Sequence, residues 1–154
     1  SPMSHTNTGN PAYIKLNGQI ASEFLINSYI AAMHKVPVLF ISGDKGICLE
    51  AKKLIPGITA VETKIGVGGS TINISPEKVL KLIEKGSEES LKKDLSENQV
   101  MLPETFEEEI RFKQHINAYK MSFYPGMEAV DGNTIKISTD NFMDIVTAHM
   151  FVLY

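Results

Sequence analysis

VPVLFISGD, residues 36–44, is the stretch that decides the fold. A continuous apolar run closed by Ser42, Gly43 and Asp44 is typical of a strand buried on both faces that leads through a turn into a helix. We therefore predict an interior strand over residues 38–41, flanked on both sides in its sheet.

The segments that follow complete a strand-helix-strand unit. Residues 45–55 have helical spacing and stop at Pro56 and Gly57, after which residues 58–63 resume as a strand. Crossovers of this kind usually join neighbouring parallel strands of one sheet. The sequence thus predicts an α/β class, with strand-helix-strand units and a mixed, partly parallel sheet.

Upstream of this unit the sequence predicts a short strand and a helix. Residues 13–16 form the expected strand, which ends at an Asn-Gly pair because these residues accept positive φ at little cost. The helix is expected over residues 21–34, with Ser22 available as its N-cap and Glu23 in its first turn.

Downstream, Ser75 and Pro76 announce a helix that is expected to run to about Lys85. Together these segments make residues 1–85 an α/β part that carries the candidate site residues. The charge-mixed residues 86–104 are interpreted as a linker or surface segment.

The last portion, residues 105–154, shows a different pattern. Its apolar spacing predicts two strands and two helices, which makes it a smaller α+β portion. The strands are expected at residues 105–112 and 134–138, and the helices at residues 114–121 and 141–153.

Composition narrows the classes of partner. A chain of 154 residues with net charge -3 lacks the basic excess that binding to phosphate backbones requires, so nucleic acid is excluded as the expected partner. No apolar run approaches the ~20 residues of a membrane-spanning helix. The single cysteine and the lack of a secretory signal favour the cytoplasm, and Cys48 is interpreted as a core residue.

Several polar groups are candidate site residues. His5 lies in a polar stretch, and the non-functional alternative is a solvated histidine. Glu23 starts a helix, and the non-functional alternative is a carboxylate that stabilises the helix dipole. The loop of residues 66–70 lacks the spacing of a phosphate-binding motif and is interpreted as a flexible loop. Strand alternation sends Glu108 to the opposite face from its acidic neighbours, and the acidic run is interpreted as a solvated face. The remaining histidines, His34, His115 and His149, are assigned structural roles.

Several segments, in order, resemble the DppA-type D-aminopeptidases. The resemblance covers nearly the whole chain and is most specific between Met3 and Lys78. It rests on MSH at 3–5, NG at 17–18, SEFLIN at 22–27, VPVL at 36–39, SGD at 42–44, EAKKLIP at 50–56 and ISPEK at 74–78.

The resemblance implies a zinc-dependent aminopeptidase that binds two zinc ions, removes amino-terminal D-residues from short peptides and assembles into rings. It implies that Glu23 is a zinc ligand and His5 the catalytic histidine, and both are expected to face one cleft. Asn27, one helical turn after Glu23, is a candidate to support the site.

The family's other zinc ligands, an Asp-x-Glu and two histidines, belong to a first half that these residues do not include. The chain is therefore expected to be a carboxy-terminal half, inactive without the upstream half. The alternative is a non-catalytic assembly or regulatory module of the same fold. A small-molecule-binding domain that uses residues 66–70 is a third possibility.

Overall fold

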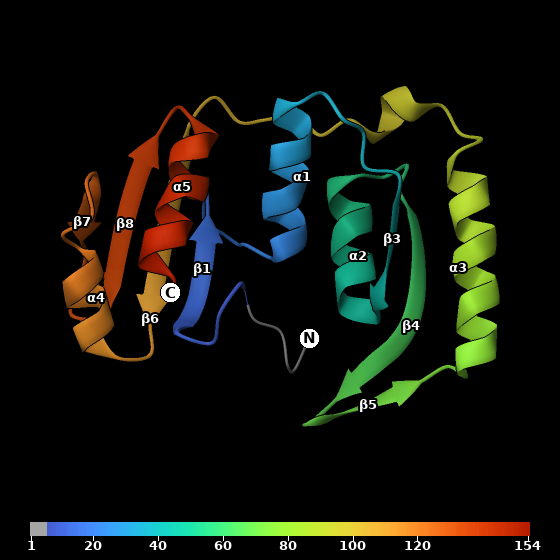
Figure 1. The fold of residues 1–154 in the computed structure, drawn as a ribbon, viewed down its shortest axis with the longest axis horizontal. Coiled ribbons are helices and arrows are strands. Elements are labelled where there is room, and N and C mark those ends of the chain that lie inside the picture. Colours follow the sequence, from blue (N-terminus) through green and yellow to red (C-terminus); the bar gives the residue numbers. More distant parts are fainter. Residues whose placement is uncertain (1–5) are drawn as a thin grey trace. The chain divides into compact units, whose positions relative to one another are not determined.

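The computed structural model describes residues 6–154 and divides into two compact units. The described part of the first unit comprises residues 27–102, and that of the second unit comprises residues 6–26 and 103–154. Helix α1 (Glu23–Met33) begins in the second unit and continues into the first. Figure 1 shows the elements of each unit.

The first unit is built on a strand-helix-strand unit, as the sequence predicted. Strand β3 (Phe40–Asp44) leads into helix α2 (Lys45–Leu54) and then to strand β4 (Thr59–Val67), which runs parallel to β3. The Asp44 carboxylate caps α2 by accepting the N–H groups of Gly46 and Ile47. The mixed α/β class is confirmed, because β5 (Ser70–Asn73) adds an antiparallel strand to the same sheet.

The prediction of an interior strand at residues 38–41 is wrong. In the three-stranded sheet the order is β3-β4-β5, so β3 is an edge strand, and the side chains of residues 38–41 are only partly buried. The strand also starts later, at Phe40. The backbone of Val38 pairs with Asn98 and not with a second neighbouring strand. The backbone carbonyl of Asn98 accepts the Val38 N–H at 3.1 Å, and the Asn98 side-chain amide donates to the Val38 carbonyl at 2.9 Å.

The glycine-bearing residues 66–70 form a hairpin rather than a flexible loop. Strands β4 and β5 are paired as far as Val67 and Ser70, which leaves a two-residue turn. Gly68 provides the positive φ of 57° that this tight turn needs. The expectation of a flexible loop is therefore corrected.

Helix α3 (Pro76–Ser90) starts where the Ser-Pro pair predicted and continues beyond Lys85. Gly86 lets α3 pack closely against β3 and β4, since an added Cβ would lie 3.0 Å from the Phe40 ring and 3.1 Å from a Val61 methyl group. A short 3-10 helix, η1 (Leu95–Asn98), follows.

The second unit contains a five-stranded antiparallel sheet in the order β2-β1-β6-β8-β7. Its strands are β1 (Pro11–Leu16), β2 (Gln19–Ile20), β6 (Phe106–Phe112), β7 (Met127–Ala129) and β8 (Thr134–Thr139). The turn between β1 and β2 is the predicted Asn-Gly turn, with φ of 49° at Asn17 and 78° at Gly18.

Two helices complete the second unit: α4 (His115–Met121) and α5 (Phe142–Val152), which lies against the sheet (Figure 1). The buried face of the sheet is apolar, because Ile110 of β6 pairs with Ile14 on one side and with Ile135 on the other. The Phe106 and Phe142 rings pack 5.0 Å apart at one end of this core. Alternation along β6 places Glu108 on the same inner face.

Within the described residues, no helix is long and apolar enough to cross a membrane.

Candidate functional site

Glu23 is the first residue of α1, and its side chain is exposed. The hydroxyl oxygen of Ser22 accepts the Leu25 N–H at 3.2 Å, so Ser22 acts at the helix start as the sequence predicted. One oxygen of the Glu23 carboxylate accepts the backbone N–H of Asn7 at 2.8 Å. The carboxylate thus sits on a rigid helix, and an amide from a distant segment orients it.

Asn7 lies at the centre of several contacts in the second unit. Its φ is 60°, a left-handed conformation that asparagine tolerates better than most residues. Beside it, the Thr6 hydroxyl donates to the Ala21 carbonyl at 2.6 Å, which ties this segment to the start of α1. The Asn7 side-chain nitrogen lies 3.4 Å from Nδ1 of His149.

His149 and Glu108 form a buried pair beneath this segment. Nε2 of His149, on α5, lies 2.7 Å from Oε1 of Glu108, on β6, and the two side chains are 7% and 0% exposed. Burial raises the pKa of the Glu108 carboxyl above its ordinary value, while the hydrogen bond from His149 opposes that shift. Among the residues that the structure describes, the second oxygen of Glu108 has no hydrogen-bond partner.

The acidic run is therefore only partly a solvated face. Glu107 is exposed and Glu109 half-buried, as expected, but Glu108 is buried. Alternation had placed Glu108 on the other face, which Phe106 and Ile110 also occupy, and that signal could have identified a buried carboxylate in need of a partner.

The other candidates are placed as follows. His5 lies outside the described residues, so its approach to Glu23 stays a prediction. Asn27 is exposed one turn after Glu23, and His34 and His115 are exposed as well. Cys48 is fully buried and its thiol lies 3.5 Å from the Val61 carbonyl, so its assignment to the core is confirmed.

The described residues fit one ligand of a metal site but not a whole one. An exposed carboxylate whose orientation an N–H donor fixes is the type of group that binds zinc. Over residues 6–154, however, no group of three or more His, Cys, Asp or Glu side chains could hold a metal ion. A complete zinc site of about three protein ligands would need groups beyond those described.

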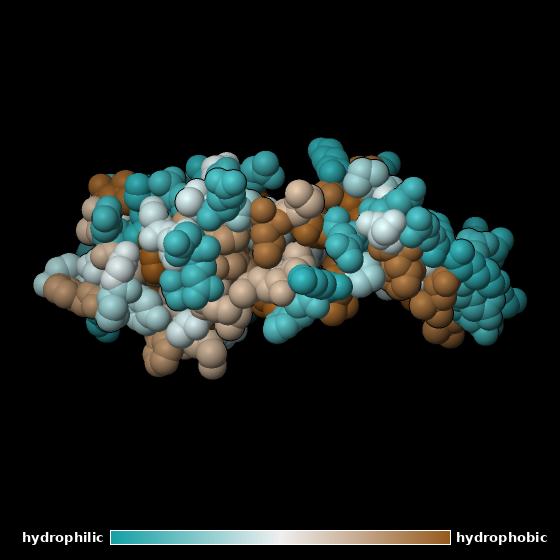
Figure 2. Space-filling model, turned by 90° about the horizontal axis from the view of Figure 1, so that it is seen from above, coloured by the Kyte–Doolittle hydropathy of each residue, from teal (hydrophilic) through white to brown (hydrophobic). Residues whose placement is uncertain are grey.

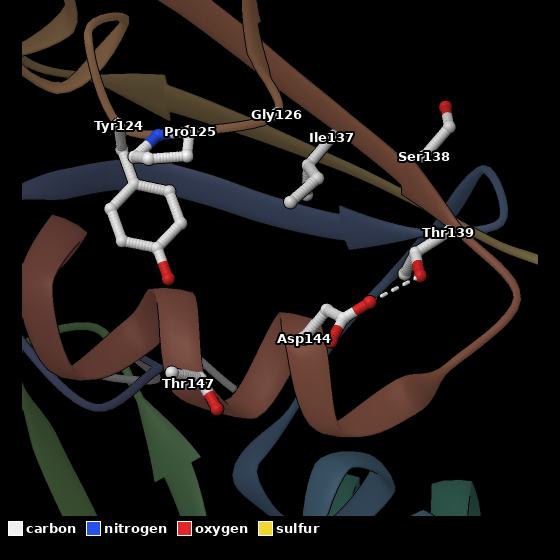
Figure 3. A pocket seen from close by; sticks show the side chains of 8 residues that line it. All are labelled: Tyr124, Pro125, Gly126, Ile137, Ser138, Thr139, Asp144 and Thr147. Carbon is white, nitrogen blue, oxygen red and sulfur yellow. Dashed lines mark hydrogen bonds between the residues drawn. The ribbon is translucent and has the colours of Figure 1, made fainter.

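A separate cavity of about 290 Å³ opens in the second unit between the turn before β7, strand β8 and helix α5 (Figure 3). Asp144 at its wall accepts a hydrogen bond from the Thr139 hydroxyl at 2.7 Å. Neither Glu23 nor His149 lines the cavity, so it is distinct from the candidate site. The lining residues are Tyr124, Pro125, Gly126, Ile137, Ser138, Thr139, Asp144 and Thr147.

The sequence is similar to those of known D-aminopeptidases. The model of the M55 peptidase family, described as D-aminopeptidase, matches residues 1–151. A D-aminopeptidase of Bacillus subtilis (strain 168) is 27% identical over 133 residues, which is 86% of this chain and 48% of that protein.

The fold is similar to a solved structure of the Zn-dependent D-aminopeptidase DppA from Bacillus subtilis, described as a self-compartmentalizing protease. The TM-score is 0.86 at 24% sequence identity, with 98% of this chain and 56% of that chain covered. The chain spans about half the length of the relatives it matches.

Proposed function

Since the chain belongs to the M55 peptidase family of D-aminopeptidases, we propose that it is the carboxy-terminal half of a zinc-dependent aminopeptidase. The substrate class is short peptides, from which the complete enzyme removes amino-terminal D-residues. The half-length match to the relatives supports a complete enzyme about twice as long as this chain. The upstream position of the other half is inferred from the family resemblance alone.

The observation that carries this proposal is the setting of Glu23. Its exposed carboxylate stands at the start of a helix, and the Asn7 N–H orients one oxygen at 2.8 Å. We assign Glu23 as a zinc ligand and His5 as the catalytic histidine. Two bound zinc ions would polarise the scissile carbonyl and lower the pKa of a bound water toward neutrality.

The residues of this chain would have distinct tasks in that reaction. Glu23 holds metal from a rigid helix, which limits how far the site can drift from a productive geometry. His5 manages the proton that the water gives up and the amine leaving group takes. The remaining ligands, an Asp-x-Glu and two histidines, come from the upstream half.

The experiment compares two matched substitutions in the chain assembled with the upstream half. Glu23→Ala removes the assigned ligand, whereas Glu77→Ala removes another carboxylate from the first turn of an exposed helix, α3. Glu23→Ala is expected to lower zinc affinity and D-alanyl peptide turnover by well over tenfold, and Glu77→Ala to leave both unchanged. Equal behaviour of the two variants would refute the assignment.

A second candidate is a non-catalytic assembly or regulatory module of the same fold. Both proposals account for the finding that residues 6–154 hold no group of three or more metal-ligating side chains, and they differ in whether an upstream half completes the site. The second candidate predicts that the chain, mixed with an upstream half, forms a complex without zinc-dependent turnover.

We also propose that the complete protein works in the cytoplasm as a ring-shaped homo-oligomer. Apolar side chains are exposed in both units (Figure 2). In the second unit they include Phe123, Phe151 and Tyr154, and such groups favour burial against another subunit.

A further inference from the structure

The buried pair of Glu108 and His149 calls for a role besides stabilising the fold. Both side chains are nearly or fully buried: Glu108 lies on the inner, otherwise apolar face of the sheet, and His149 reaches it from α5. Removing such groups from water is expensive, and apolar replacements of similar volume often serve stability equally well. A histidine and a carboxylate at this place are better explained by hydrogen bonds through which they orient another residue.

The pair holds the side chain of Asn7. When the Asn7 amide donates to Nδ1 of His149, the neutral imidazole carries its proton on Nε2 and donates it to Oε1 of Glu108. This oxygen can accept whether Glu108 is ionised or protonated, so the arrangement requires only that the imidazole of His149 is neutral, which leaves Nδ1 free to accept from Asn7. Glu108 thereby sets the tautomer that receives Asn7.

Asn7 in turn directs its backbone N–H at Glu23. Its left-handed φ of 60° sets the direction of this amide, which meets the Glu23 carboxylate at 2.8 Å. Fixing the side chain of Asn7 therefore fixes the donor that orients the carboxylate. The four residues form one hydrogen-bonded chain from the centre of the sheet to the exposed start of α1.

We propose that Glu108 and His149 are positioning residues that orient the metal-binding carboxylate of Glu23 through Asn7, an inference that rests on the proposed function of Glu23. Groups that orient a metal ligand in this way commonly change metal affinity or activity by roughly 10–100-fold when they are removed.

The first test is amide hydrogen exchange at position 7, measured by NMR on the chain without metal. Asn7→Gly keeps the left-handed backbone but removes the tether to His149, and exchange should become about tenfold faster, as expected for weakening a hydrogen bond to a charged group. Asn17→Gly is the matched control, because Asn17 is also left-handed, with φ of 49°, but contacts Thr105 and Glu107 instead. It should leave exchange at position 7 unchanged.

A second pair of variants acts at the buried end. Glu108→Gln retains a side-chain oxygen for Nε2–H of His149 and should leave exchange at position 7 near that of the unsubstituted chain. Glu108→Leu removes the acceptor while filling similar volume, and exchange should become faster by about the same factor as in Asn7→Gly. A purely structural role would not separate these two variants at position 7. Unchanged exchange in both Asn7→Gly and Glu108→Leu would overturn the proposal.

The second test is zinc affinity of the chain assembled with the upstream half. Asn7→Gly should lower it by roughly 10–100-fold and Asn17→Gly should not. A large effect of Glu23→Ala without any effect of Asn7→Gly would overturn this inference alone. No effect of Glu23→Ala would overturn the proposed function and, with it, the link from the buried pair to metal.

Discussion

Replacing His149 by alanine is expected to destabilise the chain in a pH-dependent way. The substitution removes the hydrogen bond to Oε1 of Glu108, whose other oxygen already has no partner within residues 6–154. Because Glu108 is 0% exposed, water does not replace the lost partner. Removing one partner so that an ionised carboxylate stays buried without compensation costs about 3–5 kcal/mol.

The pH dependence follows from the direction of the pKa shift. Burial already raises the folded-state pKa of Glu108, and removing His149 takes away the two contributions that lower it. A carboxyl whose folded pKa lies above its unfolded value favours folding below the unfolded value, and this contribution is lost as the pH rises through the folded value. The His149→Ala variant should therefore lose most stability at pH 7. Near pH 4.5 the unpaired but protonated carboxyl should cost only about 1–3 kcal/mol.

The assay is urea unfolding at pH 4.5 and pH 7, followed by circular dichroism because the chain has no tryptophan. His115→Ala is the control, since His115 is exposed and its loss should change the free energy of unfolding by less than about 0.5 kcal/mol. A loss below about 1 kcal/mol for His149→Ala at pH 7, or a loss that grows as the pH falls, would refute the reasoning.

Two further predictions concern local structure. Gly126→Ala should lower the free energy of unfolding by about 1–2 kcal/mol, because φ at Gly126 is 84° while the nearest atom to a new Cβ is 3.5 Å away. The measurement is thermal unfolding, and the control is Gly132→Ala, because Gly132 has open space around it and no positive φ. Equal melting temperatures for the two variants would contradict the prediction. Asp44→Ala should cost about 1 kcal/mol by removing the cap of α2, whereas the exposed Asp140→Ala should have little effect. Equal denaturant midpoints for these two variants would show that the cap contributes nothing.

Local features of the fold could be predicted from the sequence because their causes are local. The Asn-Gly pair gave the β1–β2 turn, and Pro76 gave the start of α3. The crossover from β3 through α2 to β4 followed from the order of the segments. In each case a few neighbouring residues restrict the backbone enough to decide the structure.

Non-local features could not be predicted in the same way. The apolar run at residues 38–41 indicates burial but not the number of neighbouring strands, so the edge position of β3 was missed. The pairing of β1 with β6 joins residues far apart in sequence, such as Ile14 with Ile110. Periodicity contains no information about which strand lies beside which.

In the candidate site, too, one residue could be predicted from the sequence, and the contacts between distant residues could not. Glu23 could be predicted as a zinc ligand only from the family resemblance, and that assignment stays a prediction. Its place in the first turn of a helix could be predicted from the sequence, and the structure shows an exposed Glu23 at the start of α1. The buried pair beneath Asn7 was missed, because the sequence separates His149 from Glu108 by 41 positions. Only the fold brings α5 over the centre of β6.

The most direct test of the central claim is hydrolysis of a D-alanyl peptide in the presence of zinc, by the chain alone and after mixing with the upstream half. We predict no turnover by the chain alone, because Glu23 supplies a single carboxylate and a zinc site needs about three protein ligands. Zinc-dependent turnover should appear only in the mixture. Turnover by the lone chain, or an inactive mixture in which the two halves demonstrably associate, would contradict the account.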